Sequence, residues 1–176
     1  MQRQFTCALF LTLICSAAQL NAKPSDEVFG IWASDGSVIE ITQQNQQLSA
    51  KIVAIKDALY RADEEDIKGI VGTPRKDDLN PDEALRERFL IGLELLSDYR
   101  HNGKRWEGKI YDPESGNTYS SRMHVDKDGN LKMRGYIGIS LLGRTAVFLP
   151  VTTCNADIKE MYNQSSVVKA PCDAPK

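Results

Sequence analysis

The chain has 176 residues, with 22 Lys and Arg against 24 Asp and Glu, so its formal net charge at pH 7 is −2. This length suits one domain with a hydrophobic core of ordinary size, and the average composition argues against a disordered, collagen-like or coiled-coil chain. The near-neutral charge argues against a dedicated nucleic-acid-binding protein, because such proteins carry a basic balance. Two histidines leave little scope for histidine-based metal or acid–base chemistry.

The first 22 residues have the pattern of a secretory signal peptide. Arg3 precedes an uncharged, apolar stretch over residues 5–18, which is shorter than the roughly 20 residues that a membrane-spanning helix needs. Small residues follow, so cleavage is expected after Ala22 or, as the alternative, after Ala18. No later stretch approaches membrane-spanning length. The sequence therefore predicts an exported protein, periplasmic or secreted, with no membrane span in its mature form.

The cysteines fit this prediction. Cys7 and Cys15 lie within the predicted signal peptide, and Cys154 and Cys172 remain in the mature chain. Two cysteines in an oxidising compartment indicate one disulfide, with two free thiols as the alternative. No cluster of His or Cys accompanies them, so the sequence indicates no metal site there.

Most of the mature chain has the pattern of short strands separated by turn residues such as Asp35-Gly36. The predicted strands cover residues 28–33, 37–42, 48–55, 91–99, 104–111, 117–125, 131–139 and 143–151. Eight strands at hairpin spacing favour an all-β fold with a single antiparallel barrel, which at this strand number is filled by side chains or holds one small ligand. A two-sheet sandwich is the alternative.

A long segment interrupts the strand spacing between residues 56 and 90. Its acidic cluster, residues 63–66, indicates a solvated loop face rather than a calcium site. Asn80 as an N-cap and Pro81 at the first helical position then predict a short helix over residues 81–88.

The C-terminal tail is expected to form a second short helix within residues 155–164, because Ile158, Met161 and Tyr162 have helical spacing. The predicted organisation is a signal peptide over residues 1–22, a β-barrel domain over 23–154, and a tail over 155–176 that the disulfide tethers.

One resemblance concerns the two ends of the predicted barrel domain. Gly30-Ile31-Trp32 resembles the Gly-any-Trp signature of lipocalins, and Arg144 resembles the lipocalin arginine that stacks on that tryptophan. The resemblance implies that Trp32 is buried with Arg144 on or near its ring, held by cation–π attraction. The alternative is a core tryptophan and an unrelated arginine.

A more extensive resemblance covers residues 29–149. The matching segments are residues 30–32, 78–82, 84–88, 91–93, 108–119, 131–138 and 142–145. In this order they resemble the bacterial domain-of-unknown-function family 2147. The resemblance implies a small exported bacterial protein with a lipocalin-like barrel, and it implies no established activity.

The sequence contains no nucleophile motif, phosphate-binding loop or dinucleotide fingerprint. His101 and His124 have no partner at metal-ligand spacing, and residues 126–130 lack the acid that closes a calcium loop. We therefore expect no catalytic residue, no cofactor and no metal.

Two sets of residues are candidates for ligand binding. Arg86 and Arg88 on the predicted helix would form a polar lid over the barrel mouth, with Arg88 favoured as the contact to an anionic head group. In the alternative, these arginines pair with Asp78 or Asp82 and are structural. Aromatic residues on consecutive strands would line a cavity or fill the core: Trp106, Tyr111, Tyr119 and Tyr136. The structural candidates are Gly30, Trp32, Asn80, Pro81 and Arg144.

The leading hypothesis is an exported, non-enzymatic barrel that binds a small, partly apolar or amphipathic ligand. The second is an envelope module with a filled barrel that binds a protein or the cell wall, and the third is an unrecognised enzyme. An apolar cavity favours the first, a packed interior with an exposed apolar patch favours the second, and a buried carboxylate in a cleft favours the third.

Overall fold

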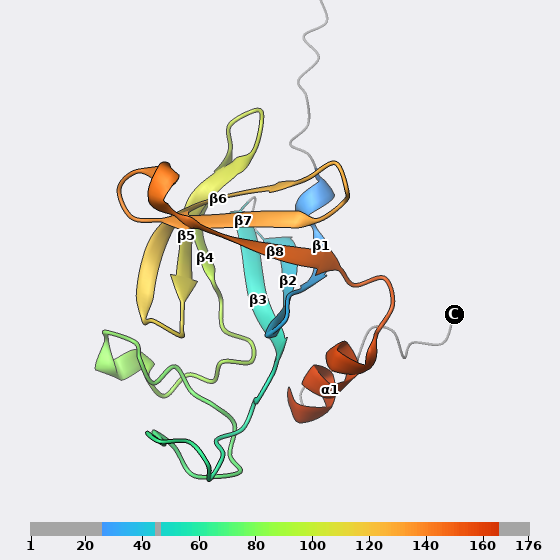
Figure 1. Cartoon of the computed structure of the whole chain (residues 1–176). Coiled ribbons are helices and arrows are strands. Elements are labelled where there is room, and N and C mark those ends of the chain that lie inside the picture. Colours follow the sequence, from blue (N-terminus) through green and yellow to red (C-terminus); the bar gives the residue numbers. More distant parts are fainter. Residues whose placement is uncertain (1–25, 45–46, 166–176) are drawn as a thin grey trace, which may run out of the picture.

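The computed structural model describes residues 26–44 and 47–165, and within them eight antiparallel strands form a nearly closed barrel (Figure 1). The strands are β1 Gly30–Ala33, β2 Ser37–Gln44, β3 Gln47–Ile55, β4 Leu96–His101, β5 Trp106–Asp112, β6 Asn117–Val125, β7 Leu131–Tyr136 and β8 Arg144–Pro150. Their order in the sheet is β3-β2-β1-β8-β7-β6-β5-β4. The predicted barrel is confirmed, and the sandwich alternative is wrong.

Short helical elements complete the described structure. Three are 3₁₀ turns, η1 Asp26–Val28, η2 Glu83–Leu85 and η3 Ser140–Leu142, and one is the α-helix α1 Ala156–Ser165. The strand ends differ from the predicted ones by a few residues, most of all in β4, which begins at Leu96 rather than at residue 91.

The barrel closes between β3 and the residues just before β4. Gly92 N–H donates to the Ile52 carbonyl at 2.8 Å, and Leu95 N–H donates to the Ala50 carbonyl at 2.8 Å. The Glu94 carboxylate adds a side-chain link, because it accepts from Ala50 N–H at 2.7 Å and from the Ser49 hydroxyl at 2.5 Å. This seam joins the two edges of the sheet, which would otherwise expose unpaired backbone groups.

The main hydrophobic core fills the barrel. Side chains alternate between the two faces of each strand, so in β7 Leu131 and Met133 point inward and are buried. Other large members of this core are Trp32, Trp106, Met123 and Phe148. The interior is therefore packed where these residues meet.

The turn η1 covers one end of this core. Val28 is buried, and its carbonyl accepts a hydrogen bond of 2.9 Å from Nε1 of Trp32. Gly30 between them has φ +130°, a conformation that L side chains rarely adopt, so glycine is needed where the chain enters β1. We call this the closed end of the barrel.

Helix α1 packs on the outside of the barrel, at the lower right of Figure 1. Ile158, Met161 and Tyr162 form a second apolar cluster with Val38 and Ala54. These helix positions are the ones that the spacing predicts, so the expected C-terminal helix is confirmed.

The predicted helix over residues 81–88 is wrong. The segment contains the single turn η2, and Asp82 rather than Asn80 caps it. The physical reason is tertiary pairing: Asp77 N–H donates to the Arg88 carbonyl at 2.9 Å, and Leu90 N–H donates to the Arg75 carbonyl at 3.0 Å. These bonds hold residues 88–90 in an extended pairing that a continued helix would break.

We expect Glu94→Ala to lower the free energy of unfolding by about 1–3 kcal/mol, because it removes the acceptor of two donors at the seam. Urea unfolding followed by tryptophan fluorescence measures the change. Glu65→Ala is the matched control, since Glu65 is exposed and has no hydrogen bond or ion pair in the described structure. Equal losses in the two variants would contradict a role of Glu94 in barrel closure.

Candidate functional site at the open end of the barrel

The end of the barrel opposite η1 is built by loops rather than by a plug. It is formed by the β1–β2 turn, the long segment between β3 and β4, the β5–β6 turn and the β7–β8 connection that contains η3. Figure 1 shows the long segment below the barrel and the β7–β8 connection at its upper left. We call this the open end.

Solvent reaches the interior along β8 at the open end. Phe148, Ala146 and Arg144 lie on one face of β8, opposite Leu131, Met133 and Gly135 of β7. Phe148 is buried, which makes this the inward face, yet Ala146 and Arg144 are exposed. The cause is the short β1, which pairs with β8 only at residues 149 and 150, so residues 144–148 have no neighbour on that side among the described strands.

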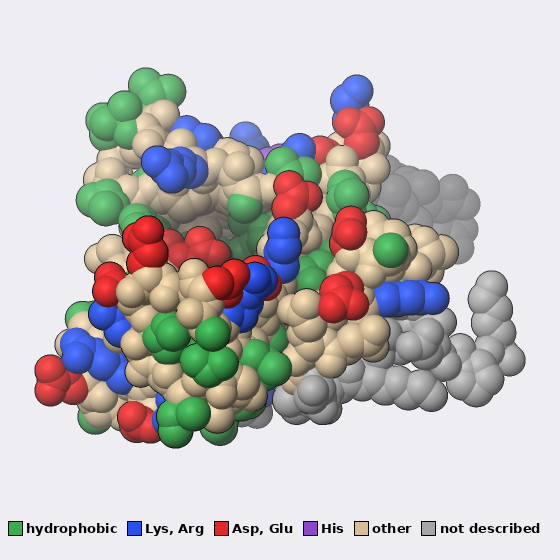
Figure 2. All heavy atoms as spheres, turned by 60° about the horizontal axis from the view of Figure 1, so that its bottom comes forward, with side chains coloured by type: hydrophobic (Ala, Val, Ile, Leu, Met, Phe, Trp, Pro, Cys, Tyr) green, Lys and Arg blue, Asp and Glu red, His purple; other side chains and the backbone are tan. Residues whose placement is uncertain are grey.

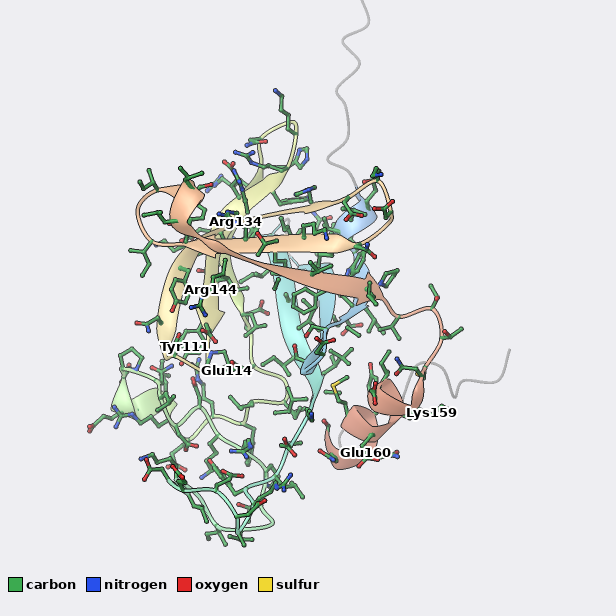
Figure 3. The ribbon with its side chains drawn as sticks, in the orientation of Figure 1. Tyr111, Glu114, Arg134, Arg144, Lys159 and Glu160 are labelled. Atoms are coloured by element: carbon green, nitrogen blue, oxygen red, sulfur yellow. The ribbon has the colours of Figure 1, made fainter. Side chains whose placement is uncertain are left out.

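Arg144 places a positive charge at this opening. Within the part of the chain that the structure describes, its guanidinium has no ion pair. Figure 3 shows Arg144 at the same end of the barrel as Tyr111 of β5 and Glu114 of the β5–β6 turn. Its strand partner Gly135 lies next to Ile110 and Tyr119, so the inward face beside Arg144 on the neighbouring strands is partly apolar.

The long segment is fixed below the opening by a buried carboxylate. Asp77 is fully buried, and it accepts from the Tyr111 hydroxyl at 2.6 Å, from Nδ2 of Asn80 at 2.8 Å and from Nη2 of Arg88 at 2.7 Å. Burial, followed by the bond to Asp77, raises the pKa of Tyr111 to about 12. The phenol therefore remains a donor at neutral pH.

A close approach of backbones joins this segment to the β5–β6 turn. Gly116 has φ +67°, and a Cβ placed there would lie 1.9 Å from the Leu79 carbonyl oxygen. Any larger residue would push the two segments apart. Gly116 and Asp77 together hold the long segment against the open end.

The two arginines predicted to face a ligand are engaged within the long segment. Arg88 pairs with Asp77, and Nε of Arg86 donates to the Asn80 carbonyl at 2.7 Å while its Nη1 pairs with Glu83. The alternative of structural arginines fits this geometry, although the acids are not the expected Asp78 and Asp82. Both guanidinium groups thus have partners within the long segment, and their contact with a ligand stays a prediction.

The aromatic candidates occupy different levels of the barrel. Trp106 is buried in the closed half, edge-on to Phe29 and His101, and its Nε1 has no hydrogen-bond partner among the described residues. Tyr111 belongs to the Asp77 network, the Tyr119 hydroxyl lies 3.1 Å from the Ser115 hydroxyl, and Tyr136 is half-buried at the end of β7.

The predicted stacking of Arg144 on Trp32 is wrong. Trp32 is buried as expected, but it pairs with Pro150, six residues further along β8 than Arg144. Six strand residues span about 20 Å, so the two side chains lie at opposite ends of β8. The Trp32 indole N–H bonds to the Val28 carbonyl instead.

The remaining structural candidates have local roles. Asn80 is buried and its Oδ1 accepts from Asp82 N–H at 2.9 Å, which makes a turn before η2, and Pro81 is exposed in that turn.

Cys172 lies outside the described residues, so the Cys154–Cys172 disulfide stays a prediction. The predicted signal peptide, residues 1–22, also lies outside them.

Sequence reasoning missed Asp77 and Glu94 as fixed carboxylates and missed Arg144 as a residue of the open end. For Arg144 a signal existed, since the alternation in β8 puts it on the same face as Phe148. For the two acids, the partners are distant in sequence and leave no local pattern.

A pocket of about 430 Å³ lies outside the barrel, between β8, the β1–β2 turn and α1. Four of its lining residues are acids, Asp35, Asp57, Asp157 and Glu160. The β1–β2 turn and the start of the long segment contribute to its lining, so it borders the open end on the outside of the barrel. In the described residues no helix is long and apolar enough to span a membrane.

The fold and the site define a lipocalin-like barrel with one closed and one open end. The chain belongs to the family described as "Uncharacterized protein conserved in bacteria (DUF2147)", which matches residues 30–149. The family resemblance noted in the sequence is thereby confirmed.

A solved structure supports the fold. The chain is similar to Protein HP1028 from the human pathogen Helicobacter pylori, which is described as belonging to the lipocalin family. The TM-score is 0.55 and the identity 23%, with 78% of this chain and 94% of that chain covered. No curated protein matches the chain.

We expect Asp77→Ala to lower the free energy of unfolding by about 2–4 kcal/mol, because three donors lose a buried charged acceptor. Urea unfolding measures the loss. Asp66→Ala, which truncates an exposed acid of the same long segment, should change stability by less than about 0.5 kcal/mol. A stable Asp77→Ala protein would show that the segment is held by its other contacts.

A second prediction concerns alkaline pH. Tyr99 is 4% exposed inside the barrel, and burial raises its pKa from 10.0 to about 12. A raised pKa means that the folded state favours the neutral phenol, so this stabilisation is complete below pH 10 and is lost as the pH rises toward 12. As the pH rises through this window, the free energy of unfolding should fall by roughly 2 kcal/mol less in Tyr99→Phe than in the parent protein. Identical falls in both proteins would contradict the shift.

Proposed function

We propose that this protein is exported and binds a small, partly apolar ligand that carries an acidic group at the open end of the barrel. One observation carries the proposal: the inward-facing Ala146 and Arg144 are exposed, whereas Phe148 and Leu131, on the same inward face nearer the closed end, are buried. The lipocalin-like fold supports small-ligand binding in general.

Arg144 is the residue that we assign to the acidic group. A guanidinium without an ion pair in the described structure is available to a carboxylate or phosphate, with which it would form a charge-assisted pair. Ile110, Tyr119 and Ala146 offer the apolar portion of the wall. The ligand class is therefore an anionic amphiphile rather than a purely apolar molecule.

One observation supports binding rather than catalysis. The buried carboxylate that would be the first candidate for acid–base work, Asp77, is occupied by three donors from the protein, including the Arg88 cation.

Export and the Cys154–Cys172 disulfide belong to the same proposal. Their support is the pattern of residues 1–22 and the presence of two cysteines in the predicted mature chain. A periplasmic or secreted binding protein would meet amphiphiles of the cell envelope.

The test uses a dansyl-labelled fatty acid and its methyl ester as probes. We expect the parent to bind the acid saturably, and Arg144→Ala to raise the Kd for the acid at least about tenfold while the Kd for the ester changes little. Arg100→Ala is the control, because Arg100 is an exposed arginine of β4 near the closed end with no ion pair in the described structure.

The stability of Arg144→Ala should match that of the parent, since the side chain is exposed. Absence of saturable binding by the parent would overturn the proposal. Equal weakening by Arg144→Ala and Arg100→Ala would overturn the assignment of Arg144.

A further inference from the structure

The β7–β8 connection exposes an unusual amount of apolar surface. Residues 137–142, which we call the apolar turn, include Ile137, Ile139, Leu141 and Leu142, whose exposed fractions are 77%, 66%, 84% and 77%. In Figure 2 hydrophobic side chains project as a group at the upper left, beside Lys and Arg side chains. Contiguous exposed apolar surface of this kind marks an interaction site in soluble proteins.

The apolar turn is held in a defined shape. Arg134 donates from Nε to the Ser140 carbonyl at 2.8 Å and from Nη2 to the Leu141 carbonyl at 2.9 Å, and its Nη1 donates to the Thr145 hydroxyl at 2.8 Å. Figure 3 shows Arg134 on β7 at the base of this connection. The backbone that carries the exposed side chains is therefore fixed, and two carbonyls of the turn already have donors. Both features lower the cost of moving the tip into an apolar medium.

The strands on either side of the apolar turn carry cations. Arg134 on β7 and Arg144 on β8 are the charged residues nearest to it along the chain, although the whole chain has a net charge of −2. Cations flanking an aliphatic tip complement a surface that is negatively charged outside and apolar inside. An anionic lipid bilayer is such a surface.

We propose that the apolar turn docks this protein on bilayers that contain anionic lipids. A convex aliphatic tip fits a deformable lipid surface, whereas a second copy of the chain would have to offer an apolar recess. The external pocket between β8 and α1 is not a purely apolar recess, since six apolar lining residues alternate there with four acids, a lysine and three other polar residues. Docking through lipids is therefore favoured over self-association.

Docking would place the open end of the barrel beside the membrane, because the apolar turn leads directly into Arg144. The bound amphiphile would then come from the bilayer itself. This consequence rests on the proposed function, whereas the docking does not.

The test is flotation of the purified protein with vesicles of phosphatidylcholine alone or with one-fifth phosphatidylglycerol. The parent should float with the anionic vesicles, and Leu141→Ser combined with Leu142→Ser should weaken partitioning about tenfold or more. Ile70→Ser with Val71→Ser is the matched control, because these residues form an exposed apolar pair on another loop. All three proteins share the same N-terminus, so residues 1–25 contribute equally.

A second measurement reports the environment of the tip itself. Leu141→Trp should show a blue shift of its added fluorescence with anionic vesicles, because the tip enters the apolar layer. Equal flotation of the parent and the Leu141/Leu142 variant would overturn the proposal, as would loss of flotation in the Ile70/Val71 control alone. A dimer in the absence of lipid that the Leu141/Leu142 changes abolish would show that the turn binds a second copy instead.

The outcomes separate this inference from the proposed function. The dansyl-labelled fatty acid is titrated without vesicles, so binding of the acid with no flotation would overturn only the membrane docking. Flotation with no binding of the acid would overturn only the ligand-binding function.

Discussion

Closure of the sheet is the constraint on which the rest of the structure depends. Residues 92–95 pair with β3, and the Glu94 carboxylate bonds to Ala50 N–H and the Ser49 hydroxyl at the seam. Closure encloses the core of Trp32, Trp106 and their neighbours, and it gives the barrel two distinct ends. A sheet left open at this seam would expose both edges and much of that core to water.

The difference between the two ends follows from strand length. β1 has four residues and meets β8 only near its C-terminal end, where Trp32 and η1 complete the closed end. The other half of β8 has no neighbour on that side among the described strands, so Ala146 and Arg144 face a solvated interior. The same short strand therefore produces both the packed core and the site.

The long segment between β3 and β4 is a support rather than a mobile lid. Asp77 binds Arg88, Asn80 and Tyr111, and Gly116 lets the backbone of Leu79 approach the β5–β6 turn. A buried charge with three donors fixes this segment in one arrangement. The proposed ligand site and docking surface therefore lie on β8 and the apolar turn, while the arginines of the long segment bond within that segment.

The sequence by itself determined the strands, the C-terminal helix, the family and the eight-stranded barrel, because alternation, turn residues and helical spacing are local properties, whereas it left open whether the barrel is filled. It also placed Trp32 in the core. Only the tertiary structure decided the partners of Arg88, Arg144 and Glu94, since each depends on which strand or loop lies opposite. The helix expected over residues 81–88 was lost for the same reason: its capping signal is local, whereas the backbone pairing of residues 75–77 with 88–90 outweighs it.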